Sequence, residues 1–197
     1  MEISELDQLT VHTEAKDITL SQLREMVDAN DILTNPDYQR NYVYDDKRAS
    51  LLVESILIGI PIPIIYLCEE DEGIFSVIDG QQRIISFTRY LKNDFPLTGL
   101  STLSALNGKY FRDLEKAVQR RLRAKSLKAI CLDRDSQSLK YEIFSRLNLG
   151  AVKLKDQEVR NCIYRGTFNT MLRNIADTDE NVKSLFHYAN NKRMEFE

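Results

Sequence analysis

The segment of residues 74–91 constrains the fold more than any other stretch of this 197-residue chain. Residues 74–78 form a β-branched and aromatic run, which predicts a strand. Asp79-Gly80 interrupts the run, and from Gln81 the apolar residues recur at helical spacing. A strand that turns at a glycine into a helix presents backbone N–H groups at the positive end of the helix dipole. The sequence therefore predicts an anion site at residues 79–83.

The side chains of this turn strengthen the prediction. Arg83 adds a guanidinium to the first helical turn, Gln81 and Gln82 add amide donors and acceptors, and Asp79 adds a carboxylate. The alternative is an ordinary strand–turn–helix with a solvated polar first turn. This mixture of chemistries favours phosphate capture over that alternative.

Composition excludes several classes of protein. With 43% hydrophobic and 29% charged residues, the chain fits a soluble globular protein. The longest apolar stretch, residues 56–67, is too short and too broken by Gly and Pro to span a bilayer, so no membrane partner is expected. Residues 1–7 are acidic, unlike a secretory leader. Three widely spaced cysteines fit reduced thiols, so a cytoplasmic location is expected.

Charge is distributed unevenly along the chain. Residues 1–100 carry 8 Lys/Arg and 18 Asp/Glu, whereas residues 101–197 carry 19 and 12. The basic half places Arg120, Arg121 and Arg123 in one predicted helix. Such a run is as often only a solvated helix face, but in an otherwise acidic chain it also predicts contacts with the DNA backbone.

The order of the predicted elements indicates an α+β fold, a small mixed sheet with flanking helices. A helix is expected to start at Asp17, and another to run from the Asp45-Asp46 pair to Gly59. A hairpin, a helix at 81–92, a helix at 114–125 and a strand at 128–132 are expected in that order: the hairpin pairs residues 64–67 with 74–78. Near residue 135 the pattern becomes almost purely helical, which predicts a core domain at 1–135 and a helical extension at 136–197. The extension ends in mid-pattern, so we expect a longer protein.

Two further clusters repeat the chemistry of the turn. Tyr38-Gln39-Arg40 lies in a predicted loop, where a tyrosine can stack on a base and an arginine can hold a phosphate. Anchoring of the loop to the core is the alternative role of its aromatic residues. Arg146 and Asn148 stand at a predicted helix end, and Glu158 begins the next helix. Taken alone, Asn148 fits a C-cap and Glu158 a first-turn acid.

Four strings, in their order along the chain, resemble the N-terminal domain of GmrSD-type restriction endonucleases. They are Tyr38-Gln39-Arg40, Gly59-Ile-Pro61-Ile-Pro63, Asp79-Gly80-Gln81-Gln82-Arg83, and Arg146-Leu-Asn148 followed by Glu158 and Arg160-Asn161. This family occurs in modification-dependent restriction systems and in proteins that sense phosphorothioated DNA. The resemblance extends over residues 17–197 and implies a fold similar to the ParB and sulfiredoxin nucleotide-binding superfamily.

The resemblance also implies that the turn binds and hydrolyses a nucleoside triphosphate, coupled to recognition of modified phage DNA. The expected catalytic residues are Asp79, Gln81, Gln82 and Arg83, with Asp79 as the Mg²⁺ ligand. The expected nucleotide-binding residues are Gly80, Arg40, Arg146, Asn148 and Glu158. The expected DNA-binding residues are Tyr38, Gln39, Arg120, Arg121 and Arg123.

Three other functions would each need a sequence feature of their own. The chain has no Gly-x-x-x-x-Gly-Lys-Ser/Thr string and is therefore not a P-loop enzyme. A module that binds nucleotide or DNA without cleaving either stays open as the alternative. A sulfiredoxin-like phosphotransferase would need a reactive cysteine where Gln82 stands. The two histidines, His12 and His187, have no ligand-spaced partners, so we expect the nuclease to lie beyond residue 197 or in a partner subunit.

Overall fold

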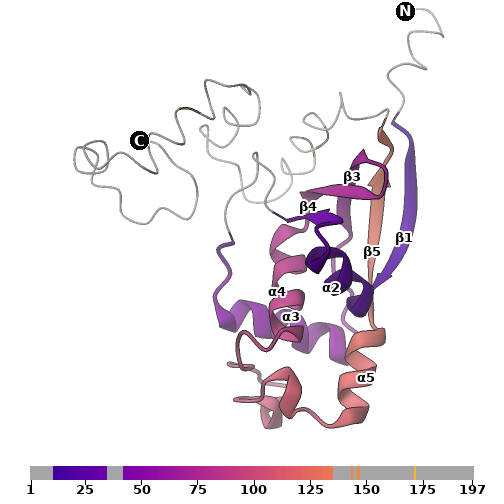
Figure 1. Cartoon of the computed structure of the whole chain (residues 1–197). Helices are drawn as coiled ribbons and strands as arrows, with labels where there is room; N and C mark the ends of the chain where they lie inside the picture. Colours follow the sequence, from indigo (N-terminus) through magenta and orange to yellow (C-terminus); the bar gives the residue numbers. More distant parts are fainter. Residues whose placement is uncertain (1–10, 35–41, 135–142, 144–145, 147–170, 172–197) are drawn as a thin grey trace, which may run out of the picture. The chain divides into compact units, whose positions relative to one another are not determined.

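The computed structural model describes residues 11–34 and 42–134, together with the single residues 143, 146 and 171. The helices and strands of these residues belong to one of the two units into which the chain divides, Met1–Pro36 with Tyr44–Lys140. Within the described residues this unit holds a five-stranded open mixed sheet and four α-helices (Figure 1). The α+β prediction is confirmed. The helical extension at 136–197 falls outside the described residues, apart from three single positions, and stays a prediction.

The sheet has the spatial order β1-β5-β3-β4-β2. Its strands are β1 (Thr13–Thr19), β2 (Ile32–Leu33), β3 (Ile65–Asp71), β4 (Ile74–Asp79) and β5 (Ser126–Leu132). β1 runs antiparallel to β5, and β3 runs antiparallel to β4. The pairs β3–β5 and β2–β4 are parallel. The central strand β3 therefore has the hairpin partner β4 on one side and the distant strand β5 on the other.

The helices are α2 (Leu20–Asp28), α3 (Asp46–Ile58), α4 (Gln81–Leu91) and α5 (Lys116–Ala124), with two short 3₁₀ helices, η1 (Ser104–Leu106) and η2 (Phe111–Asp113). The side chain of Asp45 caps α3 by accepting a hydrogen bond from the Arg48 backbone N–H. Gly59 ends that helix with φ 91°, in the left-handed region that favours glycine. Both ends of α3 are as predicted.

The core lies between the helices and one face of the sheet. Alternate strand residues point into it, among them Ile65, Leu67, Val77, Leu127 and Ala129. They meet the buried stripes of the helices, among them Leu23 of α2, Val53 of α3 and Phe87 of α4. Fully burying one such aliphatic or aromatic side chain contributes about 1.5–3 kcal/mol. Among the described residues, no helix combines the length and apolar character that a membrane span requires.

The main difference from the sequence prediction is at the start of the described chain. The helix expected from Asp17 begins only at Leu20, because Asp17 to Thr19 complete strand β1. Ile18 is buried opposite Leu127, but the rest of β1 carries no apolar alternation, so its own residues give no strand signal. The predicted hairpin, α4, α5 and β5 are confirmed to within a few residues.

Candidate functional site

The predicted strand–turn–helix is present, and Gly80 is its pivot. β4 ends at Asp79, Gly80 takes φ 104° and ψ 5°, and α4 begins at Gln81 without a capping side chain. A Cβ at Gly80 would lie 2.5 Å from Cγ2 of Ile65 on the neighbouring strand. Glycine is therefore required here by the backbone conformation and by close packing on β3.

Arg83 and Asp79 form an ion pair across the turn, one helical turn apart. The Arg83 side chain is 13% exposed and the Asp79 side chain is 40% exposed. The guanidinium is thus largely enclosed and already has a carboxylate partner, while the carboxylate reaches solvent. An anion that binds Arg83 therefore meets a guanidinium of which Nη2 is already paired with Asp79.

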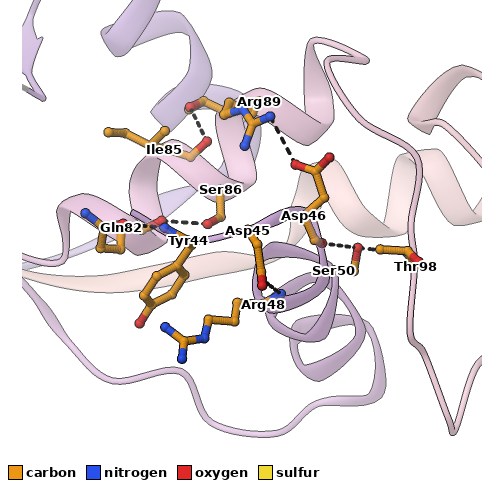
Figure 2. A network of polar contacts seen from close by, with 11 residues as sticks. Tyr44, Asp45, Asp46, Arg48, Ser50, Gln82, Ile85, Ser86, Arg89 and Thr98 are labelled. Atoms are coloured by element: carbon orange, nitrogen blue, oxygen red, sulfur yellow. Dashed lines mark hydrogen bonds and ion pairs between the residues drawn. The ribbon is translucent and has the colours of Figure 1, made fainter. Parts of the chain in front are cut away.

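The two glutamines of the turn are buried, at 4% exposure for Gln81 and 8% for Gln82. Nε2 of Gln81 donates a hydrogen bond to the Thr34 carbonyl oxygen at 2.5 Å. Oε1 of Gln82 accepts one from the Tyr44 backbone N–H at 3.2 Å (Figure 2). The two amides therefore hold the backbone on both sides of residues 35–43, the stretch that includes Arg40.

An ion pair connects α4 with α3, and hydrogen bonds within each helix lie beside it (Figure 2). Ser86 donates from Oγ to the Gln82 carbonyl oxygen at 2.7 Å, and Arg89 pairs with Asp46 at 3.2 Å. Ser50 in turn donates to the Asp46 carbonyl oxygen at 2.6 Å. Asp46 is the first residue of α3 and Arg89 lies in the last turn of α4, so this ion pair connects the start of α3 with the end of α4.

The basic run on α5 has a different environment. Arg120, Arg121 and Arg123 are exposed, whereas Gln119 and Leu122 face the interior. Most other described cations have a carboxylate within ion-pair distance: Lys16, Arg24, Arg83, Arg89, Lys92, Arg112, Lys128 and Arg134. None of the three α5 arginines has such a partner among residues 11–34 and 42–134. The arginines of this helix therefore carry charge that no described carboxylate neutralises.

A family model described as the GmrSD restriction endonuclease N-terminal domain matches residues 23–165, a range that includes the turn and α5. The chain belongs to this family. As a GmrSD N-terminal domain it is a protein of a restriction system, a class that acts in defence. Neither the curated proteins nor the solved structures gave a match.

The structure brings together only part of the site predicted for this GmrSD domain. The turn residues Asp79 to Arg83 form one cluster. Arg146 is exposed and belongs to the chain's second unit. Five predicted residues lie outside the described residues: Tyr38, Gln39, Arg40, Asn148 and Glu158.

Within the described part of the GmrSD domain, no group of three or more His, Cys, Asp or Glu side chains is placed to hold a metal ion. Asp79 is the carboxylate that the turn offers. Mg²⁺ commonly takes one or two carboxylates, substrate phosphates and several waters. The described residues therefore fit a Mg²⁺ ion that arrives with a nucleotide better than one held by protein ligands alone.

The partners of the two glutamines were not foreseen from the sequence. Thr34 precedes Gln81 by 47 residues, and Tyr44 precedes Gln82 by 38. Both partners contribute backbone atoms, which every residue type carries. No local pattern could have identified them.

Proposed function

We propose that this GmrSD domain binds and hydrolyses a nucleoside triphosphate, and thereby controls the action of a restriction protein on modified phage DNA. The observation that carries the proposal is the Asp79–Arg83 pair at the start of α4. It combines a helix N-terminus, a guanidinium suited to phosphate and a carboxylate suited to Mg²⁺ within one turn. A fold of the ParB and sulfiredoxin type is part of the same proposal, supported by the mixed sheet and its strand–turn–helix.

The pairing suggests how a nucleotide engages the turn. A phosphate group replaces the Asp79 carboxylate as the partner of Arg83, and the released carboxylate becomes available to Mg²⁺ or to the attacking water. Water, oriented by Asp79, then attacks the terminal phosphorus, and the bond to the bridging oxygen of the nucleoside diphosphate breaks. The diphosphate leaves, and the protons of the water remain on the inorganic phosphate or pass to solvent. Arg83 stabilises the charge that develops on the phosphoryl oxygens. Mg²⁺, when bound, neutralises the phosphates.

The surroundings of the turn suit the rest of a nucleotide. The chain enters β3 through Ile60 and Ile64, whose side chains are exposed although they are apolar. This segment leads directly into Ile65, the residue that packs against Gly80. Of the two chemistries of a nucleotide, a flat base and a charged phosphate chain, these exposed isoleucines suit the base.

The DNA part of the proposal rests on α5. Exposed cations of this helix, Arg120 among them, have no carboxylate partner in the described ranges and can neutralise DNA phosphates. Phosphodiester cleavage is assigned to a nuclease domain or subunit outside this chain. The described residues include no metal-ligand cluster of the kind that a metal-dependent nuclease uses.

A module that binds the triphosphate without hydrolysing it is the second candidate. It is favoured by the same ion pair, because Asp79 is engaged by Arg83 and is not held among other carboxylates. Mg²⁺-dependent release of inorganic phosphate distinguishes the two candidates, since only a hydrolase gives turnover.

The binding test is a calorimetric titration of the purified chain with each of the four ribonucleoside triphosphates and Mg²⁺. Arg83→Ala is expected to weaken binding by about tenfold to a hundredfold, because a charge-assisted hydrogen bond contributes roughly 1.5–3 kcal/mol. Arg89→Ala is the matched control: Arg89 lies in the same helix and is also ion-paired, but with Asp46. Equal affinity of wild type and Arg83→Ala, with intact circular dichroism, would overturn the assignment.

A further inference from the structure

The cations of α5 lie on two different sides of the helix. At 3.6 residues per turn, Lys116, Arg120 and Arg123 fall within a sector about 60° wide. Arg121 falls about 130° from the middle of that sector. All four residues are exposed. These three residues, Lys116, Arg120 and Arg123, are hereafter called the α5 track. The sequence prediction grouped Arg121 with Arg120 and Arg123, but on the helix Arg121 lies on a different side.

One end of the track is held in place. The guanidinium carbon of Arg123 lies 5.1 Å from the centroid of the Phe111 ring. Phe111 belongs to η2, and Gln119 of α5 holds the two helices together. Its Nε2 donates to the Leu114 carbonyl oxygen at 2.8 Å and to the Arg112 carbonyl oxygen of η2 at 3.2 Å. Stacking on an aromatic face limits the freedom of a guanidinium and leaves its N–H groups at the edges available.

The track carries charge that the described residues do not neutralise. Neither Lys116 nor Arg120 has a carboxylate within ion-pair distance in the part of the chain that the structure describes. The same holds for Arg123, which has an aromatic neighbour instead. A row of cations without an ion-pair partner among the described residues attracts a polyanion, and no described ion pair has to break when the polyanion binds.

We propose that the α5 track, Lys116, Arg120 and Arg123, holds the phosphates of one strand of duplex DNA, and that Arg121 takes no part. Seven residues of helix rise about 10 Å, which is the axial length of about three phosphates on one strand. Lys116 is thereby assigned to the DNA contact and Arg121 is removed from it. This inference rests on the proposed DNA-binding function, but not on the nucleotide site.

The test measures binding of the full chain to a fluorescent 20-base-pair duplex at several salt concentrations. Four variants each remove one positive charge: Lys116→Gln, Arg120→Gln, Arg123→Gln and the control Arg121→Gln. Each track variant is expected to lower the slope of log K against log salt by about one, and affinity at 0.1 M salt by about tenfold. Arg121→Gln is expected to change affinity less than twofold. If Arg123→Gln unfolds because it loses the contact with Phe111, the Lys116→Gln and Arg120→Gln variants still test the proposal.

The outcomes separate this inference from the function on which it rests. If Arg121→Gln weakens binding as much as Arg120→Gln, the track is wrong while DNA binding by α5 stands. If the wild type binds the duplex and none of the four variants differs from it, both assignments on α5 fail. If the wild type binds polyglutamate but no duplex, the partner is an acidic protein, and the DNA proposal is overturned. Triphosphate affinity is expected to stay unchanged in all four variants, and a parallel loss there would also contradict the track.

Discussion

The arginine at the start of α4 and those along α5 differ in how their charge is used. Arg83 is largely enclosed and pairs with Asp79 inside the protein. Arg120 is exposed and has no ion-pair partner within the described residues. An anion at the turn meets a guanidinium that already has a carboxylate partner, whereas an anion on α5 meets cations with no carboxylate partner among the described residues.

This difference has consequences for selectivity. Exchange of the Arg83 partner favours a ligand that accepts stronger hydrogen bonds than one carboxylate, or that carries several anionic groups. A triphosphate carries several such groups. Attraction to α5 depends on charge density and salt, and is indifferent to sequence. The turn is therefore suited to choosing a small ligand, and the helix to holding a long one.

The largest expected effect tests how tightly the turn is enclosed. Gly80→Ala is expected to lower the free energy of unfolding by about 2–5 kcal/mol, because the new methyl group adds left-handed strain and overpacks against Ile65. The measurement is urea unfolding followed by circular dichroism. Gly73→Ala is the control: its φ of 75° is also positive, but a Cβ there meets nothing within 4 Å. Equal costs for the two substitutions would mean that the turn is not enclosed.

An intermediate effect compares a buried amide of the turn with an exposed cation of α5. Gln81→Leu leaves the Thr34 carbonyl oxygen without its donor, and is expected to cost about 1–3 kcal/mol of stability. Arg121→Gln is expected to stay within about 0.5 kcal/mol of the wild type, as for most surface substitutions. The same urea unfolding experiment measures both. A neutral Gln81→Leu would show that its hydrogen bond contributes nothing to holding Thr34.

The smallest expected effect concerns cations that are paired inside the unit. A hydrogen bond from Lys92 holds the pKa of the Asp28 carboxyl below its usual value, with Arg24 adding to the effect. A lowered pKa in the folded state contributes stability above the ordinary carboxyl pKa of about 4, and that stability is lost as pH falls through the lower folded value. Because solvent screens this exposed pair, the loss is expected to be under about 1 kcal/mol.

Asp28→Asn is expected to flatten that part of the curve of stability against pH between about 5 and 2. Arg120 has no carboxylate partner among the described residues. Arg120→Gln is therefore expected to leave the acidic part of the curve of stability against pH unchanged. Identical curves for Asp28→Asn and the wild type would remove the Lys92 pairing as a source of acid sensitivity.

The sequence predicted those elements whose signals are local. Asp45 and Gly59 mark the two ends of α3, and both act as caps in the structure. The switch from strand to helical spacing at Gly80 located the turn to the residue. Strand β1 was missed because its pairing with β5, and not its own residue pattern, makes it a strand.

The sequence predicted which residues form the turn, but not how they are paired or buried. The residues of the turn could be chosen from their types and order. Within the described residues, Arg83 is paired and the exposed α5 cations are not. This depends on which carboxylates the fold brings near, and residue spacing reveals it only within a helix. The burial of Gln81 and Gln82 likewise depends on backbone atoms contributed from far along the chain.

The pairing of β1 with β5 sets the order in which the unit can be completed during synthesis. Asp17 and Lys128 lie opposite each other, yet they are 111 residues apart in the chain. At roughly 5–20 residues per second, on the order of ten seconds separate their appearance from the ribosome. Until β5 emerges, β1 has no neighbour and β3 has one unpaired edge, the kind of edge on which chains aggregate. A nascent chain that stalls between α4 and β5 would thus hold the Gly80 turn on a sheet with an open edge until β5 arrives.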